Sequence, residues 1–343
     1  MKSRSILILA RLSIFCIFLV IIAGSVVRMT GSGMGCPDWP KCYGYTIPPT
    51  DIEPLIFAEG KQFQKGQMVI LNDTLWVANK TLTATSNFDR TEWHKYPKHD
   101  YAVFNATHTW IEYINRLATV LLGIPVMLLF AVSALRLFRK KDVYTFLWST
   151  LAVLMLGFEA WLGKVVVDGN LKENSITYHM LGSLALVAFI IMVIIRHGEI
   201  NLRSAQPSII KIYWAVMLAF SFIQVMMGTQ VREHVDVIAK SGADRSTWIE
   251  QLPAIFLVHR SFSILVVLLC VAIYLQTKKH NHPLTQSKVL IVILGLELAA
   301  GVGLNYFGMP AFLQPVHLFL GVVMFACSYY AVNIYRSTPG MQS

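Results

Sequence analysis

The chain has 343 residues, of which 55% are hydrophobic and 14% charged, and its formal net charge is +10. Soluble domains average about 25% charged residues, so the composition excludes an ordinary soluble protein, and the absence of low-complexity tracts excludes a disordered or fibrous chain. The positive charge is typical either of a nucleic-acid-binding surface or of a membrane protein with basic cytoplasmic loops.

Eight apolar segments are long enough to cross a membrane, which requires about 20 mostly apolar residues. The first follows Lys2 and Arg4, as a signal peptide would, but its apolar run is longer and no clear cleavage site follows it. We therefore expect a retained helix there. The predicted spans are 6–27, 109–134, 144–165, 176–195, 209–230, 253–275, 288–307 and 313–335.

The segments between the spans alternate in charge. Both termini and the loops on their side contain Lys and Arg with only two acids, Asp142 and Glu199, whereas the loops of the other side balance acids and bases. Because basic loops stay in the cytoplasm, we predict that the N- and C-termini are cytoplasmic. The net charge then marks orientation, so we expect contact with membrane lipid and no nucleic-acid binding.

The first outer loop, 28–108, is much longer than the others. Its runs of Val, Thr and Trp, as in 67–78, are typical of strands, and Asn72-Asp73 is a signal for a hairpin turn. Either this loop forms a small β-rich subdomain or it is a loosely folded insertion.

Four short patterns recur in the same order in the two halves of the chain, which indicates an internal duplication. The matching segments are 24–28 with 228–232, 114–116 with 258–260, 156–159 with 294–297, and His179 with His317. The offset between matches changes mainly once, within the long outer loop. We predict an all-α membrane protein of two repeated four-helix bundles, 1–200 with the 28–108 extracytoplasmic insertion, and 201–343.

Several ionisable side chains lie inside the predicted spans, where each costs about 2.5–3.5 kcal/mol at the helix centre and is a functional candidate. These residues are Glu112, Glu159, His179, His259, Glu297 and His317. Paired imidazoles at matched depth on neighbouring helices are natural ligands for haem iron. We expect His259 and His317 to hold one haem; the alternative is that polar neighbours satisfy each histidine.

The N-terminal half differs, because Asn115 occupies the position equivalent to His259. His108, Glu112 and Asn115 share one helical face. Either the iron opposite His179 keeps an open or weakly held position, or His108 is its ligand. Glu112 would carry a proton or stabilise a cationic intermediate, unless it only favours the helix dipole.

The charged residues beside these positions have several possible partners. Arg116 and Arg260 suit haem propionates or glutamates, because a guanidinium pairs bidentately with a carboxylate. Glu159 and Glu297 would pair with arginines, conduct protons, or serve only in packing between helices.

Two of the five cysteines, Cys36 and Cys42, lie just outside the first span. A disulfide is feasible on an oxidising outer face, either as a structural bridge or with a redox or thiol-exchange role.

The segment RMTGSGMGCPDWPKC at 28–42 resembles the signature that follows the first span in haem A synthases. The similarity extends over all eight spans, but not over most of the 44–107 insertion. The other matching residues are WIEYINR at 110–116, His179, GTQVR at 228–232, His259-Arg260 and His317.

The resemblance implies oxidation of the C8 methyl group of haem O to a formyl group by successive hydroxylations, which gives haem A for terminal oxidases. By position, His259 and His317 match the axial ligands of a b-type haem, and His179 matches a ligand of the substrate haem. Glu112 matches the glutamate considered catalytic, and the outer cysteine pair also matches. Asn115 departs from the family's usual histidine, which leaves His108 as a substitute ligand or the iron five-coordinate.

The resemblance also implies a multi-pass protein of the bacterial inner membrane with a role in cytochrome oxidase assembly. Haem O synthase is the expected substrate donor, and an unidentified redox partner exchanges electrons. The alternatives are a membrane electron carrier with two b-type haems, or an assembly protein that handles haem without converting it.

Overall fold

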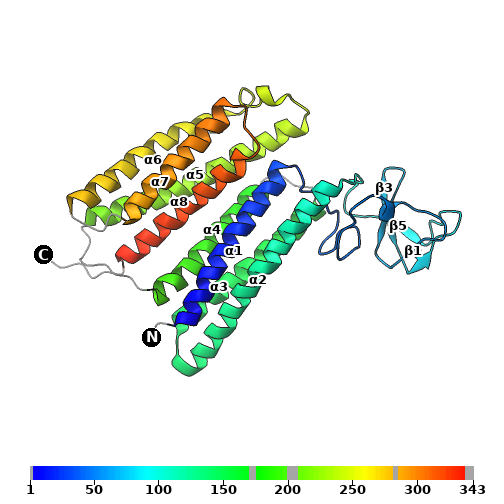
Figure 1. Ribbon diagram of the computed structural model, residues 1–343, viewed down its shortest axis with the longest axis horizontal. Helices are drawn as coiled ribbons and strands as arrows, with labels where there is room; N and C mark the ends of the chain where they lie inside the picture. Colours follow the sequence, from blue (N-terminus) through cyan, green and yellow to red (C-terminus); the bar gives the residue numbers. More distant parts are fainter. Residues whose placement is uncertain (1–2, 170–174, 199–207, 281–284, 337–343) are drawn as a thin grey trace. The chain divides into compact units, whose positions relative to one another are not determined.

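The computed structural model describes residues 3–169, 175–198, 208–280 and 285–336. Eight helices in these ranges are long and apolar enough to cross a membrane, which confirms the eight predicted spans (Figure 1). They are α1 (Arg4–Met29), α2 (Ala106–Lys140), α3 (Val143–Asp168), α4 (Ser175–His197), α5 (Ser208–Lys240), α6 (Ala254–Lys279), α7 (Thr285–Tyr306) and α8 (Leu313–Arg336). The orientation of the termini and the duplication stay predictions.

Helix α5 differs most from its predicted bounds, because it continues beyond residue 230 to Lys240. Its added turns carry polar residues that the hydropathy of a span does not include. Arg232 pairs there with Asp236, and its guanidinium also donates to the side chain of Gln314 at the start of α8. These contacts stabilise the part of α5 that extends beyond its apolar segment.

The contacts between residues divide the chain into two compact units. The first contains Met1–Ser25, Leu121–Glu159 and Ile176–Ser343, and the second contains Val26–Val120 and Ala160–Ser175. The predicted boundary near residue 200 concerns the duplication and stays a prediction.

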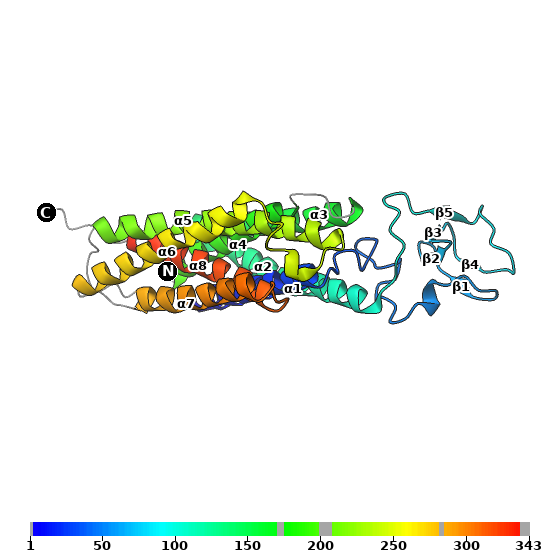
Figure 2. The same ribbon diagram turned by 90° about the horizontal axis from the view of Figure 1, so that it is seen from above.

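In the first unit, α5, α6, α7 and α8 close into a ring, since α5 and α7 each contact both α6 and α8. Figures 1 and 2 show these four helices running side by side. Their shared core includes Trp214, Cys270 and Leu290. A second apolar cluster joins the first-unit parts of α1 to α4 with α5 and α8, and burial of such apolar surface is what orders these helices against one another.

The second unit contains the β-rich part of the long outer loop. Strands β2 (Met68–Leu71), β3 (Thr74–Ala78) and β5 (Trp93–Lys95) form one sheet, and β1 (Gln62–Phe63) pairs with β4 (Leu82–Thr83). The predicted hairpin is confirmed: Asn72 and Asp73 connect β2 to β3 with φ of 50° and 52°, as a tight two-residue turn requires. The loosely folded alternative is therefore wrong.

Aromatic side chains hold this small subdomain together. Phe63 and Trp93 are buried in its core, and Phe57, Trp76 and Phe88 pack around them. Their rings meet mainly edge to face, as aromatic pairs prefer. The subdomain thus has a core of its own.

Candidate functional site

Two predicted haem ligands, His259 and His317, face each other within the ring of α5 to α8. His259 lies on α6 and His317 on α8; their ring centroids are 6.2 Å apart and their ring planes are nearly perpendicular, at 89°. Two imidazoles on opposite sides of one metal ion have centroids about 6 Å apart, because a metal–nitrogen bond is about 2 Å long. The spacing of this pair therefore fits a single haem iron between the rings.

Glycines of the neighbouring helices lie close to both rings. A Cβ atom at Gly228 of α5 would lie 3.4 Å from Cε1 of His259, and one at Gly301 of α7 would lie 3.3 Å from Cε1 of His317. Among the described residues, the buried Nδ1 atoms of His259 and His317 have no hydrogen-bond partner. The protein's own groups therefore leave one polar atom of each ring unsatisfied.

The third predicted ligand, His179 on α4, contacts a glutamate of α3. Its Nδ1 lies 2.8 Å from Oε2 of Glu159. In the second half of the chain, Nδ1 of His317 lies 3.3 Å from Oε1 of Glu297 on α7. The sequence prediction considered arginines, proton conduction or packing for these glutamates and missed their histidine partners. The common offset of the Glu and His matches was the signal that pointed to them.

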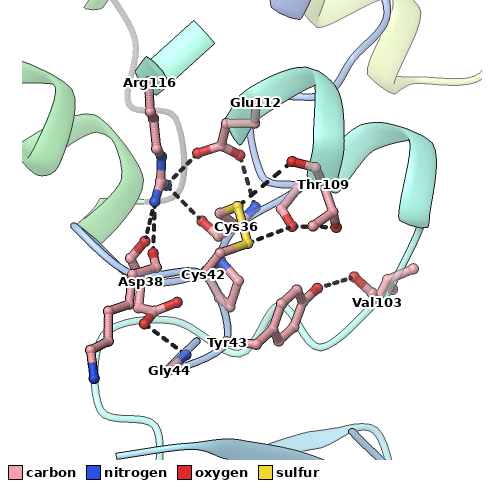
Figure 3. Close-up of a disulfide and its surroundings, with 12 residues drawn as sticks. Cys36, Asp38, Cys42, Tyr43, Gly44, Val103, Thr109, Glu112 and Arg116 are labelled. Atoms are coloured by element: carbon pink, nitrogen blue, oxygen red, sulfur yellow. Dashed lines mark hydrogen bonds and ion pairs between the residues drawn. A yellow bond between two sulfur atoms is a disulfide. The ribbon is translucent and has the colours of Figure 1, made fainter. Parts of the chain in front are cut away.

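Glu112 lies in the second unit, near the start of α2, and is only 4% exposed. Its Oε2 accepts a hydrogen bond of 2.8 Å from the backbone N–H of Cys36, and its Oε1 pairs with the guanidinium of Arg116 one turn along the helix (Figure 3). Both carboxylate oxygens are therefore held by the protein, and Glu112 is fixed against the loop that carries the cysteines.

Arg116 binds the same loop directly. Its guanidinium donates to the carbonyl oxygens of Asp38 at 2.8 Å, Lys41 at 2.7 Å and Cys36 at 3.3 Å (Figure 3). Of its two predicted partners, a glutamate is thus present, and pairing with a haem propionate stays a prediction. One side chain joins Glu112 to three backbone positions of the loop.

Cys36 and Cys42 form a disulfide, with sulfur atoms 2.06 Å apart and Cα atoms 4.7 Å apart. Both residues are fully buried. The loop between them is also held from the insertion, since the Tyr96 hydroxyl and the His99 ring both donate to the carbonyl oxygen of Pro37, at 2.9 and 3.1 Å. The insertion therefore covers the disulfide loop and holds it through hydrogen bonds.

Asp38 is the titratable group at the centre of this loop. Burial raises the pKa of its carboxyl group above the ordinary value, and a 3.0 Å hydrogen bond from the N–H of Gly44 and the charge of Arg116 only partly offset that effect. A charged Asp38 carboxylate therefore loses its hydration in this loop, and the hydrogen bond from Gly44 and the charge of Arg116 compensate for only part of that loss.

The remaining predicted site residues have fewer contacts. His108 is half-buried in the first turn of α2, and its carbonyl oxygen packs against Gly35, where no Cβ would fit. Oδ1 of Asn115 is buried and has no hydrogen-bond partner among the described residues. Arg260 is exposed, with its guanidinium over the Phe256 ring at 5.7 Å. Their roles toward a haem stay predictions.

These features define a class: a multi-span membrane protein with facing histidines inside a helix bundle and a disulfide loop next to a buried glutamate. The chain belongs to the COX15-CtaA family of cytochrome oxidase assembly proteins, whose pattern it matches over residues 7–74 and 65–329. The predicted resemblance to haem A synthases is confirmed at the level of the family.

Individual relatives carry the name Heme A synthase. The chain is 21% identical to one from Flavobacterium johnsoniae, over 97% of this chain and 98% of the relative. It is 23% identical to one from Halalkalibacterium halodurans, over 96% and 97%. It is 24% identical to one from Shewanella oneidensis over 64% of this chain, and this match spans 54% of that relative.

Proposed function

We propose that the protein is a haem A synthase, which oxidises the C8 methyl group of haem O to a formyl group by successive hydroxylations. The observation that carries this proposal is similarity along nearly the whole chain to relatives named Heme A synthase. The conversion removes electrons and adds an oxygen atom, so it requires an oxygen source and an electron acceptor. The product serves terminal oxidases, in keeping with a family of cytochrome oxidase assembly proteins.

His259 and His317 would hold a resident b-type haem, which supplies electron transfer when bound. The 6.2 Å separation of the ring centroids supports this assignment.

His179 would bind the iron of the substrate haem, and the sequence offers Asn115 or His108 as a further ligand. Glu112 would accept a proton from the substrate while Arg116 and the Cys36 N–H hold it in place. Each carboxylate oxygen has two lone pairs and uses one of them in the observed contacts, so both oxygens can still accept a proton. That His179 and Glu112 serve one haem rests on the sequence.

We further propose that the protein resides in a bacterial inner membrane, with both termini in the cytoplasm. Haem O synthase would deliver the substrate, and a separate redox partner would exchange electrons with the resident haem. The basic loops on the side of the termini support this orientation.

The test is expression in a host that makes haem O but lacks haem A, followed by extraction of the haems. We expect hydroxymethyl or formyl haem in addition to haem b. Stable protein in the presence of haem O with no modified haem would refute the enzyme. Two unmodified b-type haems would favour the electron carrier instead.

A further inference from the structure

Each half of the first unit contains the same contact between a glutamate and a histidine. Glu159 of α3 contacts His179 of α4, and Glu297 of α7 contacts His317 of α8, with a sequence separation of 20 in both cases. The contact is made at Nδ1 of each ring, the nitrogen closer to the backbone. The same arrangement at two places separated by more than a hundred residues indicates a shared purpose.

A glycine lies next to the carboxylate of each of these glutamates. Gly182 lies one turn after His179 on α4, and a Cβ atom there would overlap Oε1 of Glu159. Gly321 lies one turn after His317 on α8, and a Cβ atom there would lie 3.4 Å from Oε1 of Glu297. At Gly182, therefore, the absence of a side chain leaves space for the carboxylate of Glu159, whereas a Cβ atom at Gly321 would only be in ordinary van der Waals contact with Glu297.

These glutamates are expected to lower the stability of the folded protein. Oε1 of Glu159 and Oε2 of Glu297 are buried and have no hydrogen-bond partner among the described residues. A charged group in a membrane helix costs about 2.5–3.5 kcal/mol, and a buried acceptor without a partner adds to that cost. A role beyond packing is needed to account for them.

A carboxylate at Nδ1 has a defined effect on an imidazole. A neutral imidazole donates from one nitrogen and accepts at the other, so an acceptor at Nδ1 places the N–H there and leaves the lone pair on Nε2. The same hydrogen bond orients the ring and strengthens its donation to a bound metal. Stronger donation stabilises the oxidised metal and lowers its reduction potential.

We propose that Glu159 and Glu297 are positioning residues, which direct Nε2 of His179 and His317 to haem iron and lower the reduction potentials of the two haems. The effect is larger for His179, because Glu159 forms a hydrogen bond of 2.8 Å, whereas Glu297 approaches to 3.3 Å without hydrogen-bond geometry. The proposal rests on the proposed function in assuming a haem at each histidine.

The test measures both reduction potentials in the purified holoprotein by optical titration. Glu159→Gln and Glu297→Gln should each shift the reduction equilibrium of one haem toward the ferrous state. We expect at least tenfold, about 59 mV for one electron, for Glu159→Gln and less for Glu297→Gln. Glu233→Gln is the matched control, because Glu233 contacts Thr177 rather than a histidine.

A second pair of variants keeps every charge. Gly182→Ala should displace Glu159 and move the same potential in the same direction, whereas Gly157→Ala on α3 has open space for its methyl group and should change nothing. Retained haems with unchanged potentials in Glu159→Gln and Gly182→Ala would overturn the proposal. A purified wild-type protein that binds no haem would refute the proposed function instead.

Should the glutamine variants lose haem, the wild-type protein decides the matter by resonance Raman spectroscopy. An iron–histidine stretching frequency raised above that of a histidine without a carboxylate partner supports the proposal. A frequency equal to that reference overturns it.

Discussion

The Glu112 cluster and the His259–His317 pair differ in how far the protein satisfies their polar atoms. Both oxygens of Glu112 have protein partners, and Arg116 reaches three carbonyl oxygens of the adjacent loop. In the histidine pair, the buried Nδ1 atoms of His259 and His317 have no hydrogen-bond partner among the described residues. The protein thus satisfies the carboxylate of Glu112 but not these two ring nitrogens.

This difference separates two kinds of functional residue. Changes in the histidine pair should affect what is bound, and changes in the Glu112 cluster should affect conversion and local stability with the resident haem still bound. Variants of single residues in the two regions test this division.

The largest effect is expected for His317→Ala. It would remove one of the two proposed haem ligands, so the reduced spectrum of haem b should disappear from the purified protein. His234→Ala is the control, since His234 is exposed on α5 and should leave the spectrum unchanged. A full haem b spectrum in His317→Ala would refute the assignment of His317 as a haem ligand.

Arg116→Lys should come next, with conversion of haem O reduced about a hundredfold, within the usual range for loss of acid–base positioning. An ammonium group is a compact charge and cannot form the fork that joins Glu112 to three carbonyls. Product haems extracted at equal expression measure the effect. The control is Lys95→Ala, which changes an exposed residue of β5. Normal conversion in Arg116→Lys would contradict the role of Arg116 in holding Glu112 against the loop.

Replacing both Cys36 and Cys42 with serine should lower the free energy of unfolding by about 2 kcal/mol, the value expected for a short closed loop. Denaturant unfolding of the purified protein, followed by tryptophan fluorescence, measures this change. The haem b content should stay normal. A loss of haem b at unchanged stability would show that the disulfide acts on the histidine pair rather than on the loop.

The smallest effect concerns Asp38 and pH. Its pKa is raised by burial, so its contribution to stability is present below the ordinary Asp value of about 3.9 and is lost as pH rises through the higher folded pKa. Asp38→Asn keeps an oxygen for the N–H of Gly44 and should remove this loss, so its melting temperature should fall less between pH 4 and pH 8.

Asp89→Asn provides a control of opposite sign. Hydrogen bonds from Thr91 lower the pKa of Asp89, so this carboxylate contributes stability above its ordinary pKa that is lost as pH falls. The variant should therefore lose stability near neutral pH. Identical pH profiles for wild type and Asp38→Asn would contradict the assigned state of Asp38.

The eight spans and the hairpin at Asn72-Asp73 were predictable, because hydropathy and left-handed turn residues act locally along the chain. The clamp by Arg116 was not, since backbone carbonyl partners leave no trace in the side-chain sequence. The histidine–glutamate contacts were partly predictable: the repeated spacing marked both residues, but only the helix packing shows which faces meet.

Glu112 would serve conversion, and the histidine pair would serve the resident haem. The most direct measurement is haem extraction from Glu112→Gln expressed in a host that makes haem O. We predict haem b at the wild-type level, haem O without hydroxymethyl or formyl products, and an intact disulfide. Haem A at the wild-type level, or loss of haem b, would refute these roles of Glu112 and the histidine pair.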